Sequence, residues 1–358
     1  MKVGLGIPGP ILNDETLIFA RQAGATHIVA HFVSGLLGEK EDTWLRGGLR
    51  RSYENDPRYD YESLVELRDR ASEQGLTLES IENFAPADWY DVLLDGPRRD
   101  EQMDRVKQVV RNVGRAGIPT MGYNFSIAGV WGRPHQPTAR GGALSATFAN
   151  SEQTPIPRGM VWNMVYDAEL YERSLRNGDF VEPISQEQLW DRYSRFLNEI
   201  LPVAEESGVI LALHPDDPPL PELRGAARLV HRAHIYDRVL GLNRSPSNAM
   251  EFCVGTLSEM PDQDIYEVVE HFVATGRIQY VHLRNVQGRV PDYRETFIDE
   301  GYVDMQRILR ILHEGGFDGV VIPDHTPLIA TSSPWHTGMA YALGWIRSAM
   351  KAVGALER

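Results

Sequence analysis

Potential metal ligands occur near the ends of four consecutive strand-like segments in the second half of the chain. The ligand types are imidazole, thiolate and carboxylate, a mixture that suits a borderline divalent transition metal such as Mn²⁺, Fe²⁺, Co²⁺ or Zn²⁺. Taken singly, each residue has an ordinary structural explanation, since buried cysteines pack as small apolar groups and histidines often form only hydrogen bonds. Their repeated position at strand ends instead predicts one shared metal site, formed by His214, Cys253, His282 and Asp324.

Polar residues at neighbouring positions are candidates for binding a substrate. Arg284 and Asn285 follow the ligand His282, and an arginine offers a bidentate fork to a carboxylate; a structural ion pair is the alternative. Asp216 lies in the rigid segment HPDDPP (214–219), where it either contacts substrate hydroxyls or only forms the turn. Strand ends earlier in the chain give three more candidates: His31, Glu79 and Asn124.

Eight strand-like runs must position these residues, and most are followed by a longer helical pattern. The runs are almost continuously apolar, which is typical of strands buried on both faces of a parallel sheet. Eight such units in 358 residues predict a (β/α)8 TIM barrel, whose strand ends converge on one face. A doubly wound open sheet is the rival, although no GxGxxG motif follows the first strand. The expected strands lie at 3–7, 27–32, 76–82, 119–125, 209–215, 248–255, 278–285 and 319–325.

Two long segments exceed what a minimal barrel needs. One follows the second strand (33–60) and the other follows the fourth strand (126–185). Both are expected on the face that carries the strand ends, as walls or a lid over the site, because long connections there usually serve function. No linker or repeat divides the sequence, so we expect a single barrel domain over 1–358, with 126–185 as an insertion in it.

The overall composition limits the partners. A formal net charge of −14 argues against nucleic acid or an anionic membrane. No apolar run approaches the roughly 20 residues that span a bilayer, and the N-terminal stretch has no signal-peptide pattern. The single cysteine cannot form an intramolecular disulfide. These features predict a cytoplasmic enzyme that acts on a small molecule, and they leave a homo-oligomer open.

Four motifs of the chain are distinctive: LALHPDDPP (211–219), FCVGTLSEM (252–260), YVHLRNV (280–286) and PDH (323–325). They resemble motifs of the mannonate dehydratase family, and weaker similarity to that family runs along the whole chain. The resemblance implies a barrel enzyme of hexuronate catabolism that binds a divalent metal, commonly Mn²⁺. It also implies the dehydration of D-mannonate to 2-keto-3-deoxy-D-gluconate. The family's ligands correspond to four residues of this chain: His214, Cys253, His282 and Asp324.

The implied reaction needs proton transfer at two places. The C2 proton is weakly acidic, so a metal chelated by the substrate carboxylate and 2-hydroxyl would stabilise the enediolate-like charge. One group must remove that proton, and another must protonate the departing 3-hydroxyl. Where the family has its catalytic tyrosine, the segment SPWHTGMAYALG (333–344) places His336. We therefore expect His336 to act as acid or base, helped by Asp324 or His325; the alternative is a loop histidine without a catalytic role.

Other departures from the family affect the expected substrate pocket. The segment YNFSIAGVWGRPHQP (123–137) keeps Trp131 and Arg133, two further candidates for substrate contact, only approximately in the family's register. The segment ESIENFAP (79–86) adds Glu82. Two other functions therefore stay open. One is a sugar isomerase or epimerase on the same barrel, which also needs a metal-stabilised enediolate, and the other is a non-catalytic relative that binds metal or sugar.

Overall fold

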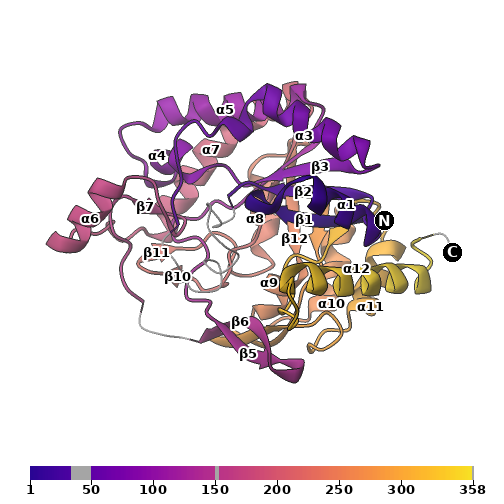
Figure 1. Ribbon diagram of the computed structural model, residues 1–358. Helices are drawn as coiled ribbons and strands as arrows, with labels where there is room; N and C mark the ends of the chain where they lie inside the picture. The colour runs from indigo at the N-terminus through magenta and orange to yellow at the C-terminus, as the bar shows by residue number, and fades with distance from the viewer. Residues whose placement is uncertain (34–49, 150–152, 357–358) are drawn as a thin grey trace.

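A computed structural model describes residues 1–33, 50–149 and 153–356 of the chain. Eight parallel strands form a closed barrel in the order β1-β16-β13-β12-β9-β4-β3-β2, and helices lie around it (Figure 1). Because β1 pairs with both β2 and β16, the ring closes, and the open-sheet alternative is wrong. The strands coincide with the predicted segments, which confirms the TIM barrel. They are β1 (Lys2–Pro8), β2 (His27–His31), β3 (Thr77–Glu82), β4 (Thr120–Tyr123), β9 (Ile210–Leu213), β12 (Asn248–Cys253), β13 (Ile278–His282) and β16 (Val320–Ile322).

The helices form where an apolar face and capping residues occur together, and the longest helix, α7, shows both. Ser185 and Gln188 form a reciprocal capping box at its start, and Gly208 ends it in a left-handed conformation with φ of +66°. No helix in the described part of the chain is long and apolar enough to cross a membrane. The helices are α1 (Asp14–Gln22), α3 (Tyr61–Glu73), α4 (Tyr90–Leu94), α5 (Arg99–Arg115), α6 (Ala168–Asn177), α7 (Gln186–Ser207), α8 (Ile235–Leu242), α9 (Val254–Glu259), α10 (Ile265–Val273), α11 (Met305–Glu314) and α12 (Pro334–Ala352).

Strand register brings the predicted metal ligands to one end of the barrel. Cys253 and His282 are direct partners in the β12–β13 ladder. His214 follows the last residue of β9, and Asp324 lies two residues beyond Ile322, the partner of His282 on β16. Since all four strands run parallel, their carboxyl ends deliver these side chains to the same face.

Insertions extend the structure beyond the barrel. After β4 the chain forms β5 and β6, the hairpin β7–β8 and helix α6. Strands β5 and β6 join an antiparallel sheet in the order β14-β15-β6-β5, and the sequence did not predict the β14–β15 connection after β13. Of the predicted insertion at 33–60, residues 34–49 lie outside the described residues. The shorter strands are β5 (His135–Ala139), β6 (Ala143–Ala149), β7 (Met160–Val161), β8 (Met164–Val165), β10 (Glu222–Leu223), β11 (Ala226–Ala227), β14 (Asn285–Arg289) and β15 (Asp292–Thr296).

Candidate metal centre

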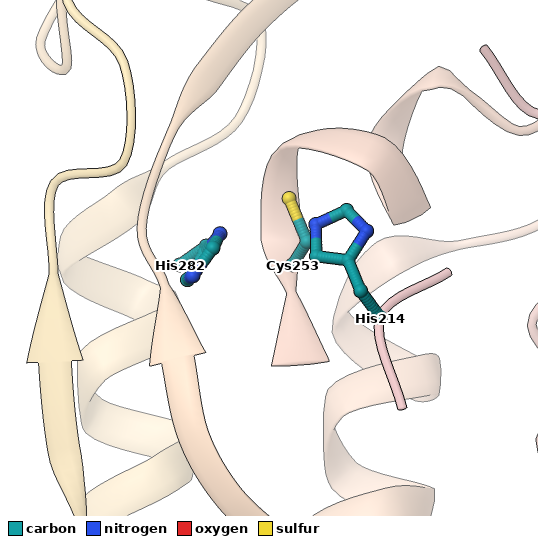
Figure 2. A group of neighbouring side chains, drawn as sticks. All are labelled: His214, Cys253 and His282. Atoms are coloured by element: carbon teal, nitrogen blue, oxygen red, sulfur yellow. The ribbon is translucent and has the colours of Figure 1, made fainter. Parts of the chain in front are cut away.

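Three of the predicted ligands converge at the carboxyl-terminal end of the barrel. Ligand atoms of His214, Cys253 and His282 all lie within 4.8 Å of one another. In the view of Figure 2, the Cys253 sulfur lies between the two imidazole rings, whose centroids are 5.4 Å apart. This spacing suits a single ion, because nitrogen and sulfur donors bind such ions at about 2.0–2.3 Å.

Asp324 adds a carboxylate to the same cluster. Its Oδ1 lies 3.5 Å from His282 Nδ1, and its Oδ2 lies 4.0 Å from the Cys253 sulfur. The residue follows β16 with φ of +58°, in the left-handed region that aspartate tolerates better than most side chains. Arg284 Nε donates a 3.0 Å hydrogen bond to Oδ2 and fixes the carboxylate there. The structure thus brings together all four residues that the sequence indicated as ligands.

The surroundings favour the ionised forms of the thiol and the carboxyl group. Burial alone would raise the pKa of the Cys253 thiol, but the charge of Arg284 and the neighbouring His214 imidazole hold it well below its usual range. Burial also opposes ionisation of Asp324, yet the nearby His325 and His282 keep the pKa of this carboxyl well below its usual range. A thiolate and a carboxylate together carry two negative charges, which match a divalent cation.

The histidine nitrogens also fit a metal. His214 Nδ1 donates a 2.6 Å hydrogen bond to the Pro215 carbonyl oxygen, which leaves Nε2 as the ligand nitrogen. Both nitrogens of His282 are buried without a hydrogen-bond partner among the described residues. Buried polar groups are nearly always satisfied, so an imidazole in this state beside a thiolate is what a metal ligand requires. The donor set therefore fits a borderline divalent ion.

A cavity lies beside the cluster, and both the barrel and the insertions form its wall. Besides Asp324, four residues with predicted substrate or catalytic roles line it: His31, Asn124, Arg133 and His325. Arg133 is held in the wall by Asp217, whose Oδ2 lies 2.6 Å from Nη1. The insertions contribute further wall residues, among them Arg50, His135 and Trp162.

Arg284 does not line the cavity, contrary to its predicted contact with substrate. Its side chain is only 1% exposed, and its nitrogens donate hydrogen bonds to several carboxylates. The guanidinium lies behind the candidate ligand cluster because α9 and β15 supply acidic partners there. In this position it stabilises the negative charges of the cluster and does not reach the cavity. The acceptors are Asp217, Glu259, Glu295 and Asp324.

His336 also lies outside the cavity wall. It stands in the first turn of α12, with its ring centroid 4.9 Å from those of Phe19 and Trp335. The helix turns Trp335 and Met339 towards the cavity instead. Residues four apart share a helix face, whereas the next residue is rotated by about 100°. His336 thus lies outside the cavity wall, and its acid/base role stays a prediction; His325, eleven residues earlier, is the predicted catalytic histidine that lines the cavity.

Two other predicted substrate contacts support the backbone instead. Asp216 accepts a 2.8 Å hydrogen bond from the Val230 amide and pairs with Arg228 at 3.0 Å. The Asn285 side chain donates two 2.9 Å hydrogen bonds to backbone carbonyls of the connection that follows it. In the HPDDPP segment, the aspartate that lines the cavity is Asp217, the residue after Asp216. In such an irregular corner, sequence spacing does not determine which side chain turns inward.

Glu79 and Trp131 are displaced from the cavity as well. Glu79 lies on β3 towards the amino-terminal end of the barrel, and Glu82, at the other end of the strand, lines the cavity instead. Trp131 packs beneath the Arg224 guanidinium, whose carbon is 5.3 Å from a ring centroid of the indole. The aromatic wall comes from Trp162, at the tip of the β7–β8 hairpin, with φ of +53°. Neither residue lines the cavity, so contact of Glu79 or Trp131 with the substrate stays a prediction.

Two acidic residues close to the cluster, Glu251 and Glu295, were not predicted from the sequence. Glu251 stands two positions before Cys253 on β12, so both side chains face the same side of the strand. A glutamate within the otherwise mostly apolar strand NAMEFC is a signal that could have revealed it. Glu295 comes from β15, where it contacts Arg133 and Arg284, and no motif in that connection pointed to it.

Comparison with known proteins decides the family. The family model described as D-mannonate dehydratase (UxuA) matches residues 13–357. This chain belongs to the mannonate dehydratase family. A mannonate dehydratase from Streptococcus pneumoniae (strain 70585) is 31% identical over 312 residues, which cover 82% of this chain and 84% of that protein. The crystal structure of mannonate dehydratase from Streptococcus suis serotype 2 matches with a TM-score of 0.77 and 26% identity, covering 100% of this chain and 96% of that one.

Sugar epimerases share the barrel with this mannonate dehydratase family member. D-Psicose 3-epimerase from Clostridium cellulolyticum H10 matches 98% of this chain and 99% of its own, with a TM-score of 0.59 and 12% identity. A likeness at that level of identity shows the fold alone. The chain is therefore a mannonate dehydratase-like hydro-lyase by sequence, and its resemblance to epimerases is a resemblance of architecture.

Proposed function

We propose that this protein is a metal-dependent enzyme that converts D-mannonate into 2-keto-3-deoxy-D-gluconate. The observation that carries the proposal is the convergence of two imidazoles, a thiolate and a carboxylate beside a cavity, in a chain of this family. We assign Mn²⁺ as the ion, with Fe²⁺, Co²⁺ and Zn²⁺ as substitutes, because all accept this mixture of donors. We assign the enzyme to the cytoplasm, since a free thiolate ligand stays reduced there.

Four residues would hold the ion: His214, Cys253, His282 and Asp324. A bound divalent ion supplies Lewis acidity that stabilises the negative charge developing on the substrate as the C2 proton leaves. The chain itself keeps the anionic ligands in place. Arg284 donates to Asp324 at 3.0 Å, and the Thr256 hydroxyl and amide lie 3.2 Å and 3.4 Å from the Cys253 sulfur. These contacts favour the thiolate and the carboxylate before any substrate enters.

Proton transfer at the substrate is assigned to His325. Its ring lines the cavity, and its Nδ1 lies 3.1 Å from Glu295 Oε1. Burial lowers the pKa of His325 to about 4, against the opposing charge of Asp324. The imidazole is therefore neutral near pH 7 and accepts the C2 proton, and the resulting imidazolium protonates the departing 3-hydroxyl. Loss of water leaves an enol, which becomes the 2-keto product when C3 takes up a proton.

Two arginines of the cavity wall offer partners for the carboxylate of a sugar acid, beside three carboxylates that line the same cavity, Glu82, Asp217 and Asp324. Arg50 and Arg133 both line the cavity. Burial and the Arg133 charge lower the pKa of Arg50 from its ordinary value, so the two guanidinium groups lie within electrostatic range of each other. Positive charge in a partly enclosed cavity attracts a carboxylate. Hydroxyl groups of the substrate have His31 and Asn124 as further partners in the wall.

The direct test uses purified protein that is stripped of metal and then reloaded with Mn²⁺. We expect D-mannonate to yield the 2-keto-3-deoxy acid, detected as product by chromatography and mass, and neutral aldoses and ketoses to be left unchanged. Epimerised or isomerised sugars as the products would favour the epimerase alternative. Bound metal without turnover of any aldonate would favour the non-catalytic one.

A matched pair of histidine variants tests the assignment of the proton-transfer residue. His325→Gln should lower kcat by about 100-fold or more, the range that general acid–base catalysis contributes. His336→Gln removes a half-buried histidine that packs against Phe19 and Trp335 outside the cavity wall, and it should change kcat by less than ~2-fold. Equal losses in the two variants would contradict the assignment.

A further inference from the structure

Two buried glutamates lie directly beside the candidate ligand His282. Carboxylate oxygens of Glu82 and Glu251 and one nitrogen of His282 lie within 4.8 Å of one another. The Glu251 side chain is fully buried and that of Glu82 is 8% exposed. Among the described residues, neither oxygen of Glu251 has a hydrogen-bond partner. A carboxylate buried in this way is destabilising unless something nearby compensates it.

The two nitrogens of His282 face different groups. Nδ1 lies 3.5 Å from Asp324 Oδ1, on the side of the candidate metal cluster. Nε2 lies 3.1 Å from Glu251 Oε1 and 3.5 Å from Glu82 Oε2. A carboxyl oxygen that carries no proton only accepts hydrogen bonds, so a proton on Nε2 suits Glu251 Oε1 and Glu82 Oε2, and the lone pair then remains on Nδ1. The arrangement selects the tautomer that a metal ligand needs.

We propose that Glu251, assisted by Glu82, is a positioning residue of the metal centre. It accepts the Nε2–H of His282, orients the ring and makes Nδ1 a stronger donor to the ion, as carboxylates behind metal-bound histidines do. The 3.1 Å contact is not aligned as a hydrogen bond in the structure, and a small rotation of the ring as Nδ1 takes up an ion would align it. The inference rests on the proposed function only in requiring that a divalent ion binds at this cluster.

The barrel is built to hold this carboxylate pair. Tyr280 Oη donates a 3.3 Å hydrogen bond to Glu82 Oε2 from the strand that carries His282. Gly122 on β4 leaves the space that the pair occupies, because a Cβ there would lie 2.1 Å from Tyr280 Oη and 2.6 Å from Glu251 Oε2. Neighbouring strands thus supply the space, the tyrosine and the carboxylates to one place beneath the cavity.

The experiment measures Co²⁺ binding to metal-stripped protein by competition with a chelator, without substrate. Glu251→Gln should weaken Co²⁺ binding by about 10- to 100-fold, the usual effect of losing a partner behind a ligand. The matched control is Glu79→Gln, which neutralises a buried glutamate facing His27 at the other end of the barrel and should leave the affinity unchanged. If Glu251→Gln does not fold, Glu82→Gln replaces it, with a smaller loss expected because its contact is longer.

A spectroscopic signature separates positioning from general destabilisation. In Zn²⁺-loaded protein with ¹⁵N-labelled histidine, we expect His282 to carry its proton on Nε2 and the metal on Nδ1, and Glu251→Gln to alter the Nε2 signal. Wild-type Co²⁺ affinity and an unchanged His282 signal in Glu251→Gln would overturn the proposal. It would also be overturned if the wild type bound two Co²⁺ ions per chain and Glu251→Gln bound only one, because Glu251 would then be a ligand of a second ion. A wild-type protein that binds Co²⁺ normally but leaves D-mannonate unchanged would refute the proposed function and leave this inference standing.

Discussion

A buried glutamate lies against a histidine at each end of the barrel, but the pair at the amino-terminal end is remote from the cavity. At the carboxyl-terminal end, Glu251 Oε1 is 3.1 Å from His282 Nε2. At the amino-terminal end, Glu79 Oε2 is 4.0 Å from His27 Nε2. The residue types are the same, so their chemistry must come from what surrounds them.

The electrostatic environments of the two histidines are opposite. Burial and the nearby Lys2 charge lower the pKa of His27 to about 4. Burial acts on His282 in the same direction, but Asp324 and Glu251 outweigh it and raise the pKa of His282 well above its usual range. The difference follows from the barrel, in which loops at the carboxyl ends of the strands gather charged groups and the other end serves stability.

The largest effect in this comparison should come from the thiolate at the carboxyl-terminal end. Cys253→Ser replaces a sulfur that ionises readily with a hydroxyl that does not, so it should weaken Co²⁺ binding by more than ~100-fold, beyond the loss typical of residues behind the ligands. Metal per chain, measured by elemental analysis, and turnover should fall together, while circular dichroism stays unchanged. Full metal content in this variant would remove Cys253 from the ligand set.

An intermediate effect should follow from filling the space beneath the carboxylates. Gly122→Ala would push a methyl group against Tyr280 and Glu251, so we expect about tenfold weaker Co²⁺ binding and a loss of about 1–3 kcal/mol in the free energy of unfolding. The control is Gly4→Ala on β1, where the added Cβ would lie 2.5 Å from Val320 Cγ1 and contact only apolar side chains closely. It should be destabilised similarly and bind metal normally; weakened binding in both variants would mean that overpacking alone is responsible.

The smallest effect should arise at the amino-terminal end and concern stability alone. His27 has a pKa of about 4 when folded and about 6.5 when unfolded, so the unfolded chain binds more protons between these values. The stability from neutral His27 is therefore present above pH 6.5 and is lost as the pH falls towards 4. Between pH 7 and pH 4, the free energy of unfolding should therefore fall less in His27→Gln than in the wild type. The two decreases should differ by on the order of 1 kcal/mol after solvent screening. Urea denaturation of both proteins at pH 7 and pH 4 measures these free energies. A change of Co²⁺ affinity in His27→Gln would contradict the view that the amino-terminal pair serves stability alone.

The sequence by itself determined the barrel and the four residues that form the cluster. Barrel strands are short, nearly continuous apolar runs, and their ends are fixed by where those runs stop. A candidate ligand at a strand end, such as Cys253 or His282, then has little freedom of position, because parallel strands pair in register and open on one face.

Only the tertiary structure decided which neighbouring side chains reach the cavity. His325 faces it and His336 does not, because the orientation of α12 is set by its packing against the rest of the barrel. Arg284 follows the candidate ligand His282 in sequence by two residues, yet carboxylates from α9 and β15 hold it behind the cluster. Glu251 acquires its place from the β12–β13 pairing and from the space at Gly122. Such directions depend on contacts between segments far apart in the chain, which the local pattern that fixes a strand does not contain.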